Sequence, residues 1–555
     1  MKKNNIFTMF ILLIAIKLIF SLFISTPASF NDSYIFIKIA RSILFHGTLT
    51  IHTISTPFPI IYPLIISPTF IFHNMAIVLF LIKFINAIIS SLVVFPIYLI
   101  LKRFFDEKET FYLTILISIY PALFMFSSLV MAENILYLFY ISTLVFAYLF
   151  LEQKKLKWLI FTIFFSILAI LTKGNALSLI PLIIFLLAEY KKKYSKWIIS
   201  FLVLLVGLIL VYPNILPISL FFGTGYSATL NNFSRNLIQI GFWSRFLLYT
   251  GLVAASTFFI PFILFLITPF TKKDKEYQNL LNLYKIIIIP LFFLLIIACN
   301  NTLTYTGTEI FKFLPGRPIA RYLEMIAPLI LILGFIQFKR YSQDLKALSK
   351  PILYLIIPLS FLASILVLFP MFPTNNISLS YIGAVKVLFD FILTKQILTS
   401  PLINLWFIPF FTILFVLFCI FILKYKQKLK LFFILFLITN LFAYAFIFYS
   451  SELVWSKNPY IVAGDEISDL IEEDSTLFIN EAECLRKISK EDYSSICEPS
   501  KLFTLVGLKI NNEIIITSKE NILNSKINNS YLITKQEENL TLVKKVQPDL
   551  NLYIL

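Results

Sequence analysis

Long apolar segments recur along the first 450 residues, separated by short polar stretches. Each is long enough, or nearly so, to cross about 30 Å of hydrocarbon as a helix. The pattern predicts about thirteen membrane-spanning helices. They lie roughly at residues 6–24, 76–101, 111–128, 134–151, 158–171, 176–188, 197–212, 245–270, 285–299, 322–338, 351–369, 405–423 and 431–449. The fifth and sixth are short, and they form either two spans or one broken hairpin around "LTKGN".

Every second connection between these segments is short and basic. These connections are "KRFFDEKE" at 102, "EQKKLK" at 152, "EYKKKYSK" at 189, "TKKDKEYQ" at 271, "FKRYSQDLK" at 338 and "KYKQKLK" at 424. The positive-inside rule places them, together with Lys2 and Lys3, in the cytoplasm. The N-terminus is then cytoplasmic, and the other loops and the C-terminus are extracytoplasmic.

The extracytoplasmic segments are larger, which indicates that the protein works on its outer face. They are the loops 25–75, 213–244, 300–321 and 370–404, and the polar tail 451–555. In the tail, "AGDEISDLIEEDSTLFIN" predicts a helix and then a strand. "KLFTLVGLK" and "NEIIITSKE" predict strands or a strand and a helix start, and "SYLITKQ" and "LTLVKKV" predict closing strands. We therefore expect a transmembrane catalytic domain at 1–450 and a small extracytoplasmic α/β domain at 451–555.

Composition agrees with a polytopic α-helical membrane protein. Of 555 residues, 59% are hydrophobic and only 14% are charged, and the mean hydropathy is +0.87, which excludes a soluble globular chain. The net charge of +17 would suggest nucleic acid in a soluble protein. Here the cations follow the topology, so no nucleic-acid partner is expected.

The first segment is longer than a signal-peptide core, and we interpret it as a membrane anchor.

The first external loop contains an unusually polar stretch, "SFNDSYIFIKIARSILFHGTLTIH", at residues 29–52. Its apolar residues repeat at helical spacing from Ser33 to His46, with Asn31 or Asp32 as the N-cap and a glycine after the last turn. The stretch predicts an amphipathic helix in the membrane interface, with its cations at lipid headgroups. At this level capping alone explains the aspartate.

The spacing of this stretch resembles the first external loop of the GT-C superfamily of membrane glycosyltransferases. Asp32 is followed by Phe36, Ala40 and Gly47, as in the branch that holds protein O-mannosyltransferases and the lipid A aminoarabinose transferase. Other motifs of that branch are similar to stretches spread along this chain. They are "TPFPIIYPLIISP" at 56, "VMAENILYLFY" at 130, "LTKGNALSLIPLIIF" at 171 and "GRPIARYLEMIAPLI" at 316. The resemblance also implies thirteen spans and an exterior C-terminal domain.

The resemblance implies transfer of a sugar from a polyprenyl phosphate to a hydroxyl of a protein, lipid or glycan acceptor. Such a reaction needs a base for the acceptor proton and cations for the leaving phosphate. Asp32 is the candidate base, and Glu133 either orients the acceptor or is an exposed turn residue. The candidate substrate-binding cations, which otherwise extend toward headgroups, are Lys173, Arg317, Arg321 and Arg41.

Metal use stays open in the sequence. A divalent cation shared by Asp32 and Glu133 is the candidate cofactor, but Ser33 stands where the family has a glutamate. The three histidines, His46, His52 and His73, show no ligand spacing. Cys484 and Cys497 are placed to close a short disulfide loop in the exterior domain, and the sequence does not decide whether they do.

Three other functions remain open. A lipid-linked glycan polymerase or ligase is the nearest rival, and it uses a diphosphate carrier. A secondary transporter would carry ionisable residues at mid-membrane depth, where this chain has few. An envelope scaffold is the third. The sequence names neither the sugar, the acceptor nor the carrier lipid.

Overall fold

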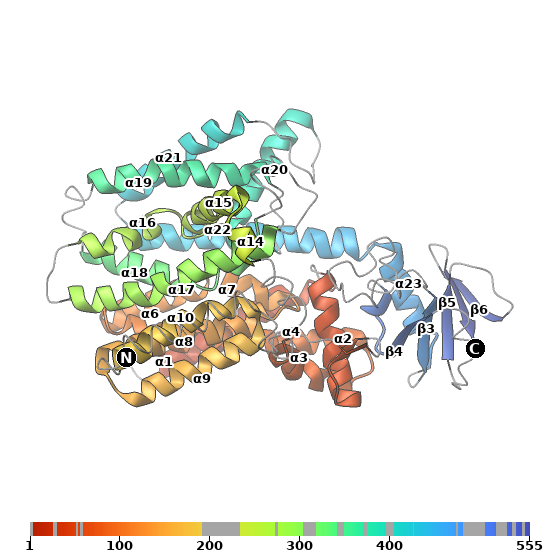
Figure 1. Cartoon of the computed structure of the whole chain (residues 1–555). Coiled ribbons are helices and arrows are strands. Elements are labelled where there is room, and N and C mark those ends of the chain that lie inside the picture. The colour runs from red at the N-terminus through yellow and green to blue at the C-terminus, as the bar shows by residue number, and fades with distance from the viewer. Residues whose placement is uncertain are drawn as a thin grey trace.

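A computed structural model shows a long helical bundle with a small sheet at one end (Figure 1). The structure describes residues 4–25, 30–51, 54–55, 59–190, 233–271, 276–303, 318–340, 349–369, 375–395, 405–425, 427–472, 475–480, 506–517, 530–534, 540–546 and 550–555.

Most helices run along the length of the bundle (Figure 1). The first half of the chain contains α1 (Asn4–Leu22), α2 (Phe30–His46), α3 (Ile61–Ile66), α4 (Met75–Ser91), α5 (Val94–Leu101), α6 (Glu107–Ser118), α7 (Pro121–Met125), α8 (Glu133–Gln153), α9 (Leu156–Thr172), α10 (Ile180–Tyr190), α14 (Phe233–Leu237), α15 (Ile240–Ser256) and α16 (Ile260–Ile267). The second half contains α17 (Tyr277–Leu303), α18 (Ala327–Arg340), α19 (Ser349–Ile365), α20 (Ser380–Thr394), α21 (Phe407–Lys424), α22 (Lys428–Phe448) and α23 (Pro459–Ser468).

Local sequence signals explain several helix ends. Asp106 caps α6 by accepting from the Glu109 backbone N–H at 2.8 Å, and the Glu109 side chain reaches back to the Asp106 N–H. Asn74 caps α4 in the same way, through the N–H groups of Ala76 and Ile77. These polar residues define where the apolar helices begin.

When helices are counted by length and apolar composition, fewer qualify as membrane spans than the sequence predicts. Within the described residues, six helices are long and apolar enough to cross a membrane, or up to eight if each of two bent pairs is one span. Other predicted spans, such as 6–24 and 158–171, correspond to shorter apolar helices. The predicted span 197–212 lies outside the described residues, so the count of thirteen stays a prediction.

The α20 helix was not predicted, because residues 370–404 were expected to form only a loop. Together with the 3-10 turn η8 (Ile377–Leu379) before it, α20 forms an apolar helix of 18 residues, long enough to pass as a span. However, Phe389 near its end contacts Phe407 and Phe410 in the first turn of α21, at ring distances of 6.4 and 5.0 Å. The helix therefore lies beside the end of the bundle at which α21 begins.

The C-terminal part of the chain contains a five-stranded mixed sheet with the order β4-β3-β5-β7-β6. Its strands are β3 (Thr476–Asn480), β4 (Glu513–Thr517), β5 (Ser530–Thr534), β6 (Thr541–Val546) and β7 (Leu550–Ile554). The pairs of β3 with β4 and β5 are parallel, and β7 pairs antiparallel with β5 and β6. Four of these strands fall in stretches predicted to form strands, and β7 was missed.

For one of the two stretches predicted as strands, or as a strand and a helix start, the described part is helical. Within "KLFTLVGLK", residues 506–509 form a short helical turn. A Cβ atom on Gly507 would lie 2.9 Å from Cε2 of Tyr34 in α2. The turn therefore brings a glycine, which has no Cβ, directly against an aromatic ring. This close contact is made by a helical turn and not by an extended strand.

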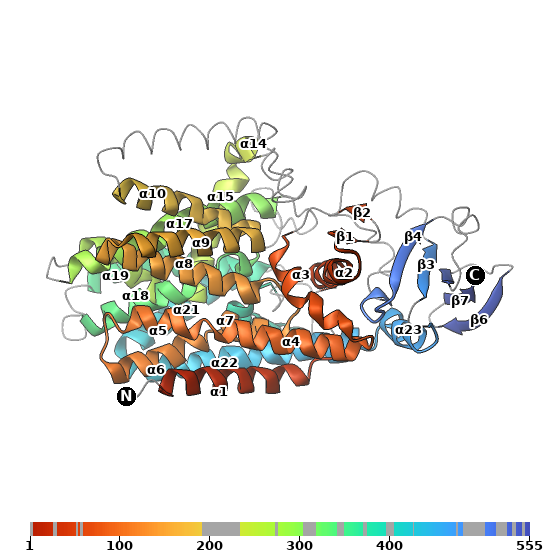
Figure 2. The same ribbon diagram turned by 90° about the horizontal axis from the view of Figure 1, so that it is seen from below.

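The α2 helix lies across the end of the bundle, between the bundle helices and the sheet (Figures 1 and 2). The Lys38 ammonium donates to the carbonyl of Ile510 at 2.9 Å, and Arg41 Nε donates to the carbonyl of Asn511. Burial, with the nearby Arg41 charge, holds the pKa of Lys38 well below its ordinary value. The prediction that Lys38 and Arg41 meet lipid headgroups is therefore wrong: both contact the C-terminal segment.

Substituting Gly507 with leucine will separate this segment from α2, because the new side chain overlaps the Tyr34 ring. Overpacking of this kind costs about 1–3 kcal/mol. We expect a lower melting temperature and faster proteolysis of the C-terminal part in detergent. Gly47→Asn is the control, since Gly47 has a φ of +66°, which asparagine tolerates, and open space around it. Equal melting of the two variants would contradict the contact.

Candidate active site

Four predicted site residues lie at the ends of four different elements. Asp32 is in the first turn of α2, and Glu133 is the first residue of α8. Lys173 occupies the extended turn after α9, before the 3-10 helix η3 (Gly174–Leu179). Arg321 lies in the 3-10 helix η6 (Ala320–Tyr322) that precedes α18. These positions are up to 289 residues apart in the chain, from 32 to 321, yet the fold brings their side chains into one cluster.

The four side chains form a continuous ionic network. Arg321 Nη2 lies 3.0 Å from Asp32 Oδ2, and Arg321 Nε lies 3.9 Å from Glu133 Oε1. Lys173 Nζ lies 2.5 Å from the same Glu133 oxygen. Two cations and two carboxylates therefore alternate, and their formal charges cancel. We call this set the ionic cluster.

Burial differs sharply within the ionic cluster. The exposed fraction of the side chain is 0% for Glu133, 9% for Arg321 and 13% for Lys173, but 32% for Asp32. Ion pairs shielded from water interact more strongly. The N-terminus of α8 also favours the Glu133 carboxylate. The cluster is thus buried at Glu133 and partly exposed to solvent at Asp32.

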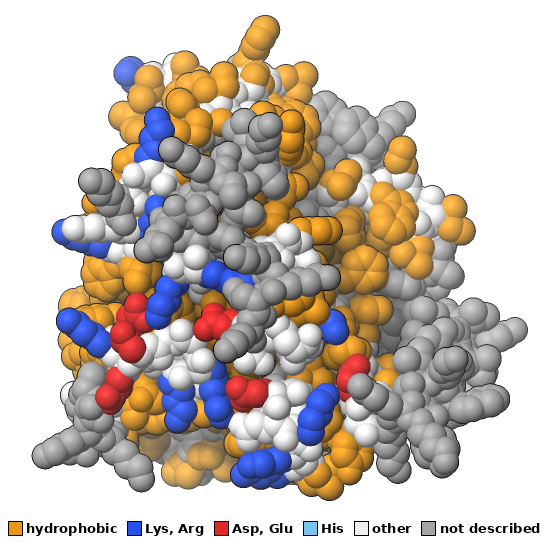
Figure 3. Space-filling view, turned by 90° about the vertical axis from the view of Figure 1, so that its left-hand side faces the viewer, with side chains coloured by type: hydrophobic (Ala, Val, Ile, Leu, Met, Phe, Trp, Pro, Cys, Tyr) orange, Lys and Arg blue, Asp and Glu red, His pale blue; other side chains and the backbone are white. Residues whose placement is uncertain are grey.

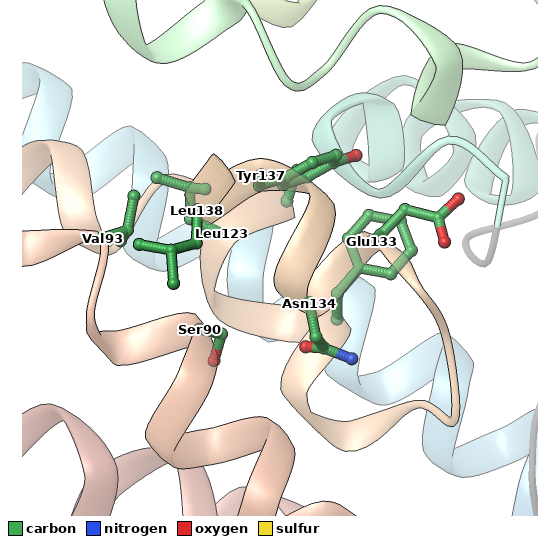
Figure 4. A pocket seen from close by; sticks show the side chains of 9 residues that line it. Ser90, Val93, Leu123, Glu133, Asn134, Tyr137 and Leu138 are labelled. Carbon is green, nitrogen blue, oxygen red and sulfur yellow. The ribbon is translucent and has the colours of Figure 1, made fainter. Parts of the chain in front are cut away.

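The depth of Glu133 follows from the position of α8. In this helix 89% of the apolar stretch is buried, the highest share among the six candidate spans. A cavity of about 10 Å³ lies beside its first turns, lined by Ser90, Leu123 and Leu138 among others. That is room for about one water molecule. Glu133 itself lines this cavity, and Figure 4 shows its carboxylate pointing away from Ser90 and Leu123.

The backbone around Arg321 is held by groups from two other elements. Its N–H donates to the carbonyl of Asn375 at 3.0 Å, and its carbonyl accepts from the Tyr137 hydroxyl at 3.2 Å. The neighbouring Ala320 N–H donates to Asn376 Oδ1 at 3.0 Å. These three hydrogen bonds fix η6 between α8 and the segment that precedes α20, and so fix the guanidinium.

Glu324 adds further hydrogen bonds between this region and the segment before α20. The sequence analysis did not identify it. It is fully buried, and its Oε1 accepts from the Ser378 N–H at 2.8 Å and from the Ser378 hydroxyl. A signal was present, since Glu324 is an acidic residue inside the otherwise apolar stretch "YLEMIAPLI". Asn376 could not be identified in the same way. It accepts a hydrogen bond from Ala320, which is 56 residues away in the chain.

Ser33, which replaces the glutamate expected from the resemblance, has a packing role here. Its hydroxyl donates to the carbonyl of Val130 at 3.0 Å. This bond ties the first turn of α2 to the approach to α8, and so brings Asp32 toward Glu133. The prediction that Asp32 caps a helix from 33 to 46 needs correction: α2 begins at Phe30, which places Asp32 inside its first turn.

The remaining predicted residues that the structure describes do not join the ionic cluster. Arg317 lies outside the described residues. Arg41 is placed over the Phe45 ring, 4.9 Å from its centroid, and contacts Asn511 instead. His46 Nε2 lies 3.9 Å from Glu513, away from the cluster. His52, Cys484 and Cys497 also fall outside the part of the chain that the structure describes.

The cluster does not favour a divalent cation. Arg321 lies within ion-pair distance of both Asp32 and Glu133, so a guanidinium already occupies the position between the two carboxylates. Among the described residues, no group of three or more histidines, cysteines, aspartates or glutamates is arranged to hold a metal ion. The chemistry of this site is therefore derived from its own side chains.

Comparison with known proteins supports the resemblance to the GT-C superfamily. A profile of the family described as dolichyl-phosphate-mannose-protein mannosyltransferase matches residues 58–216, which include Glu133 and Lys173. No curated protein sequence matches the chain.

A similar fold is found in a solved structure, and two others are less similar. ArnT from Cupriavidus metallidurans bound to undecaprenyl phosphate aligns with a TM-score of 0.52 and 12% identity, covering 100% of this chain and 98% of that chain. Its apo state gives a TM-score of 0.48 and 11% identity, covering 98% and 97%. The apo Archaeoglobus fulgidus oligosaccharyltransferase gives 0.32 and 12%, covering 95% and 69%. The chain is a multi-pass membrane protein with the fold of ArnT, and its site must be interpreted from its own residues.

Proposed function

We propose that this protein is a glycosyltransferase that moves a single sugar from a polyprenyl phosphate carrier to an acceptor hydroxyl at the outer face of the membrane. The observation that carries the proposal is the ionic cluster of Asp32, Glu133, Lys173 and Arg321 at one end of the bundle. The family profile over residues 58–216 and the shared fold with ArnT, which was crystallised with undecaprenyl phosphate, support it.

The proposed reaction balances without another reactant. The acceptor oxygen forms a bond to the anomeric carbon, and the bond from that carbon to the phosphate oxygen breaks. The acceptor proton passes to a base, and the carrier leaves as a phosphate monoester with one more negative charge than the donor. The site must therefore supply a base and stabilise growing charge on phosphate.

Arg321 and Lys173 fit the second requirement. A guanidinium presents its N–H groups as a fork that matches phosphate oxygens. The Lys173 ammonium and Arg321 Nε both lie at the same Glu133 oxygen, so Glu133 holds both cations in place before substrate arrives. Glu133 is thus a positioning residue, and the cations bind the leaving phosphate.

Asp32 fits the first requirement. Its side chain is the most exposed of the four, so an acceptor hydroxyl from solution reaches it first. Its Oδ2 lies 3.0 Å from Arg321 Nη2, and a nearby cation favours the charged form of a carboxylate. When the donor phosphate takes up the Arg321 N–H groups, Asp32 loses part of that stabilisation and becomes a stronger base. Donor binding would then precede proton transfer.

The proposed orientation follows the basic connections. The ends of α6, α18 and α21 that carry them lie together, away from the ionic cluster. The α8 helix contains 21 residues, so its two ends lie about 30 Å apart. With the basic end in the cytoplasm, the cluster and the sheet lie outside, where a lipid-linked donor and a water-soluble acceptor meet.

The function is tested by incubating membranes that contain the full-length protein with polyprenyl phosphate sugars labelled in the sugar. Label is expected in protein, lipid or glycan, and the fraction that contains it identifies the acceptor class. Use of a polyprenyl diphosphate donor alone would instead support a polymerase or ligase. Uptake of free sugar into sealed vesicles without covalent transfer would support a transporter.

Replacing Arg321 with lysine will weaken use of the donor. Lysine keeps the positive charge, but it lacks the paired N–H groups of the guanidinium that can contact Asp32 and the phosphate at the same time. Loss of one charge-assisted hydrogen bond predicts a fall in kcat/KM for the donor of about tenfold, with the acceptor KM unchanged. Arg103→Lys is the control, since Arg103 pairs with Glu152 at the other end of α8. Unchanged donor kinetics in the Arg321 variant would remove it from the phosphate site.

A further inference from the structure

A second cavity lies at the basic end of the bundle, far from the ionic cluster. Its volume is about 820 Å³, within the range of ligand-binding pockets. The walls come from the stretch before α6, the ends of α18 and α21, and the start of α22. Figure 3 views this end of the molecule and shows Lys and Arg side chains gathered on it beside hydrophobic surface.

The walls of this cavity are apolar and aromatic. Phe105, Phe335 and Phe338 line it together with Leu113 and Leu429. Leu429 remains 41% exposed, so the apolar lining continues to the protein surface. Such a lining suits a hydrocarbon chain better than a sugar or a nucleotide.

The rim of the cavity is cationic. Lys424, Lys428 and Lys430 surround it, together with Lys339 and a single carboxylate, Glu109. The carboxylate is already used, since Glu109 Oε2 lies 2.6 Å from Lys339 Nζ. Lys428 donates to two backbone carbonyls, of Leu423 and Tyr425, at 3.0 Å each. The rim therefore has three positive charges that Glu109 does not neutralise.

Two other cations at the same end have carboxylate partners. Arg103 pairs with Glu152 at 3.6 Å, and Lys154 pairs with Glu189 at 3.5 Å. Across the described residues, no carboxylate lies within salt-bridge distance of Lys424, Lys428 or Lys430. Among the described residues, Lys102, Lys155 and Lys157 at this end also have no carboxylate within that distance. Lys424, Lys428 and Lys430 differ from them because they surround an apolar cavity.

We propose that this cavity binds an anionic phospholipid of the inner leaflet, with its headgroup phosphate at the three lysines and part of an acyl chain against the phenylalanines. The charge of the rim selects a negative headgroup, and the apolar walls select a lipid over a soluble anion. The site would anchor α6, α18, α21 and α22 to one another at the end opposite the ionic cluster. It is independent of the proposed transfer reaction.

The test measures retention of phosphatidylglycerol by the full-length protein in native mass spectrometry, with phosphatidylcholine as the neutral comparison. The triple variant Lys424→Gln, Lys428→Gln, Lys430→Gln is expected to lose phosphatidylglycerol affinity by about 100-fold, because each lysine near an anionic headgroup contributes severalfold. The matched control removes three exposed lysines from the same end, as Lys102→Gln, Lys155→Gln, Lys157→Gln. It is expected to change affinity by less than about threefold.

A second variant separates a cavity from a charged surface. Leu429→Trp fills the mouth of the cavity and leaves every lysine in place, and it should lower retention of phosphatidylglycerol about tenfold. Equal losses in the two triple variants, or no loss in Leu429→Trp, would overturn the proposal in favour of nonspecific attraction. Equal retention of phosphatidylcholine, or displacement of the lipid by millimolar inorganic phosphate, would also overturn it.

Discussion

Asp32→Asn will lower the rate of sugar transfer by about 100-fold or more, the usual scale for a lost general base. Asparagine has nearly the same size and still accepts a hydrogen bond from Arg321, but it does not take up a proton. Asp32 is also the most exposed member of the ionic cluster, so its loss disturbs the buried part least. Expression and membrane insertion should therefore be unchanged while initial rates at saturating donor fall.

Asp106→Asn is the matched control for this substitution. Asp106 also lies at the start of a helix, where it caps α6, but at the opposite end of the bundle. Because asparagine caps a helix about as well as aspartate, the control should transfer sugar at the wild-type rate. If Asp32→Asn also transferred at that rate, Asp32 would be a structural residue and another base would be required.

Glu133→Gln will lower the free energy of unfolding by about 3–5 kcal/mol. The substitution leaves Lys173 and Arg321, which are 13% and 9% exposed, without the carboxylate between them. Removing one member of a buried ionic set costs far more than removing a surface partner, because the remaining charges stay desolvated. Thermal unfolding in detergent measures the effect.

Two further variants isolate the cause. Glu152→Gln lies at the far end of the same helix, where Glu152 faces Arg103 at a partly exposed site, and it should cost less than about 1 kcal/mol. The double variant Glu133→Gln, Lys173→Met removes one charge of each sign and should recover much of the lost stability. If Glu133→Gln melted like Glu152→Gln, the ionic cluster would not be a buried network.

The candidate site was largely predictable because its residues are polar groups at the ends of apolar segments. Glu133 begins a long apolar helix, and Lys173 interrupts another, so each is conspicuous in its stretch. Their mutual contact was not predictable, since it depends on how helices far apart in sequence pack side by side. The resemblance to a family had suggested that these residues belong to one site. The structure shows Lys173 and Arg321 paired with the same Glu133 oxygen.

The roles of Lys38, Arg41 and Gly507 were not predictable for the same reason. On the sequence, the two cations read as the polar face of an interfacial helix, because nothing marks a segment 470 residues later as their partner. The α20 helix was missed because its stretch was assigned to an external loop. An apolar stretch in such a loop has the same pattern as a short span, and the pattern alone does not separate the two. Patterns along the chain therefore define elements well, and partners poorly.

The central claim is that sugar leaves a monophosphate carrier at the ionic cluster. The most direct measurement uses the purified full-length protein in liposomes and a polyprenyl phosphate sugar labelled separately in the phosphate and in the sugar. We expect one polyprenyl monophosphate to appear for each sugar that reaches the acceptor, and Asp32→Asn to lower both signals together. Release of a diphosphate, or transfer that continues unchanged in Asp32→Asn, would contradict it.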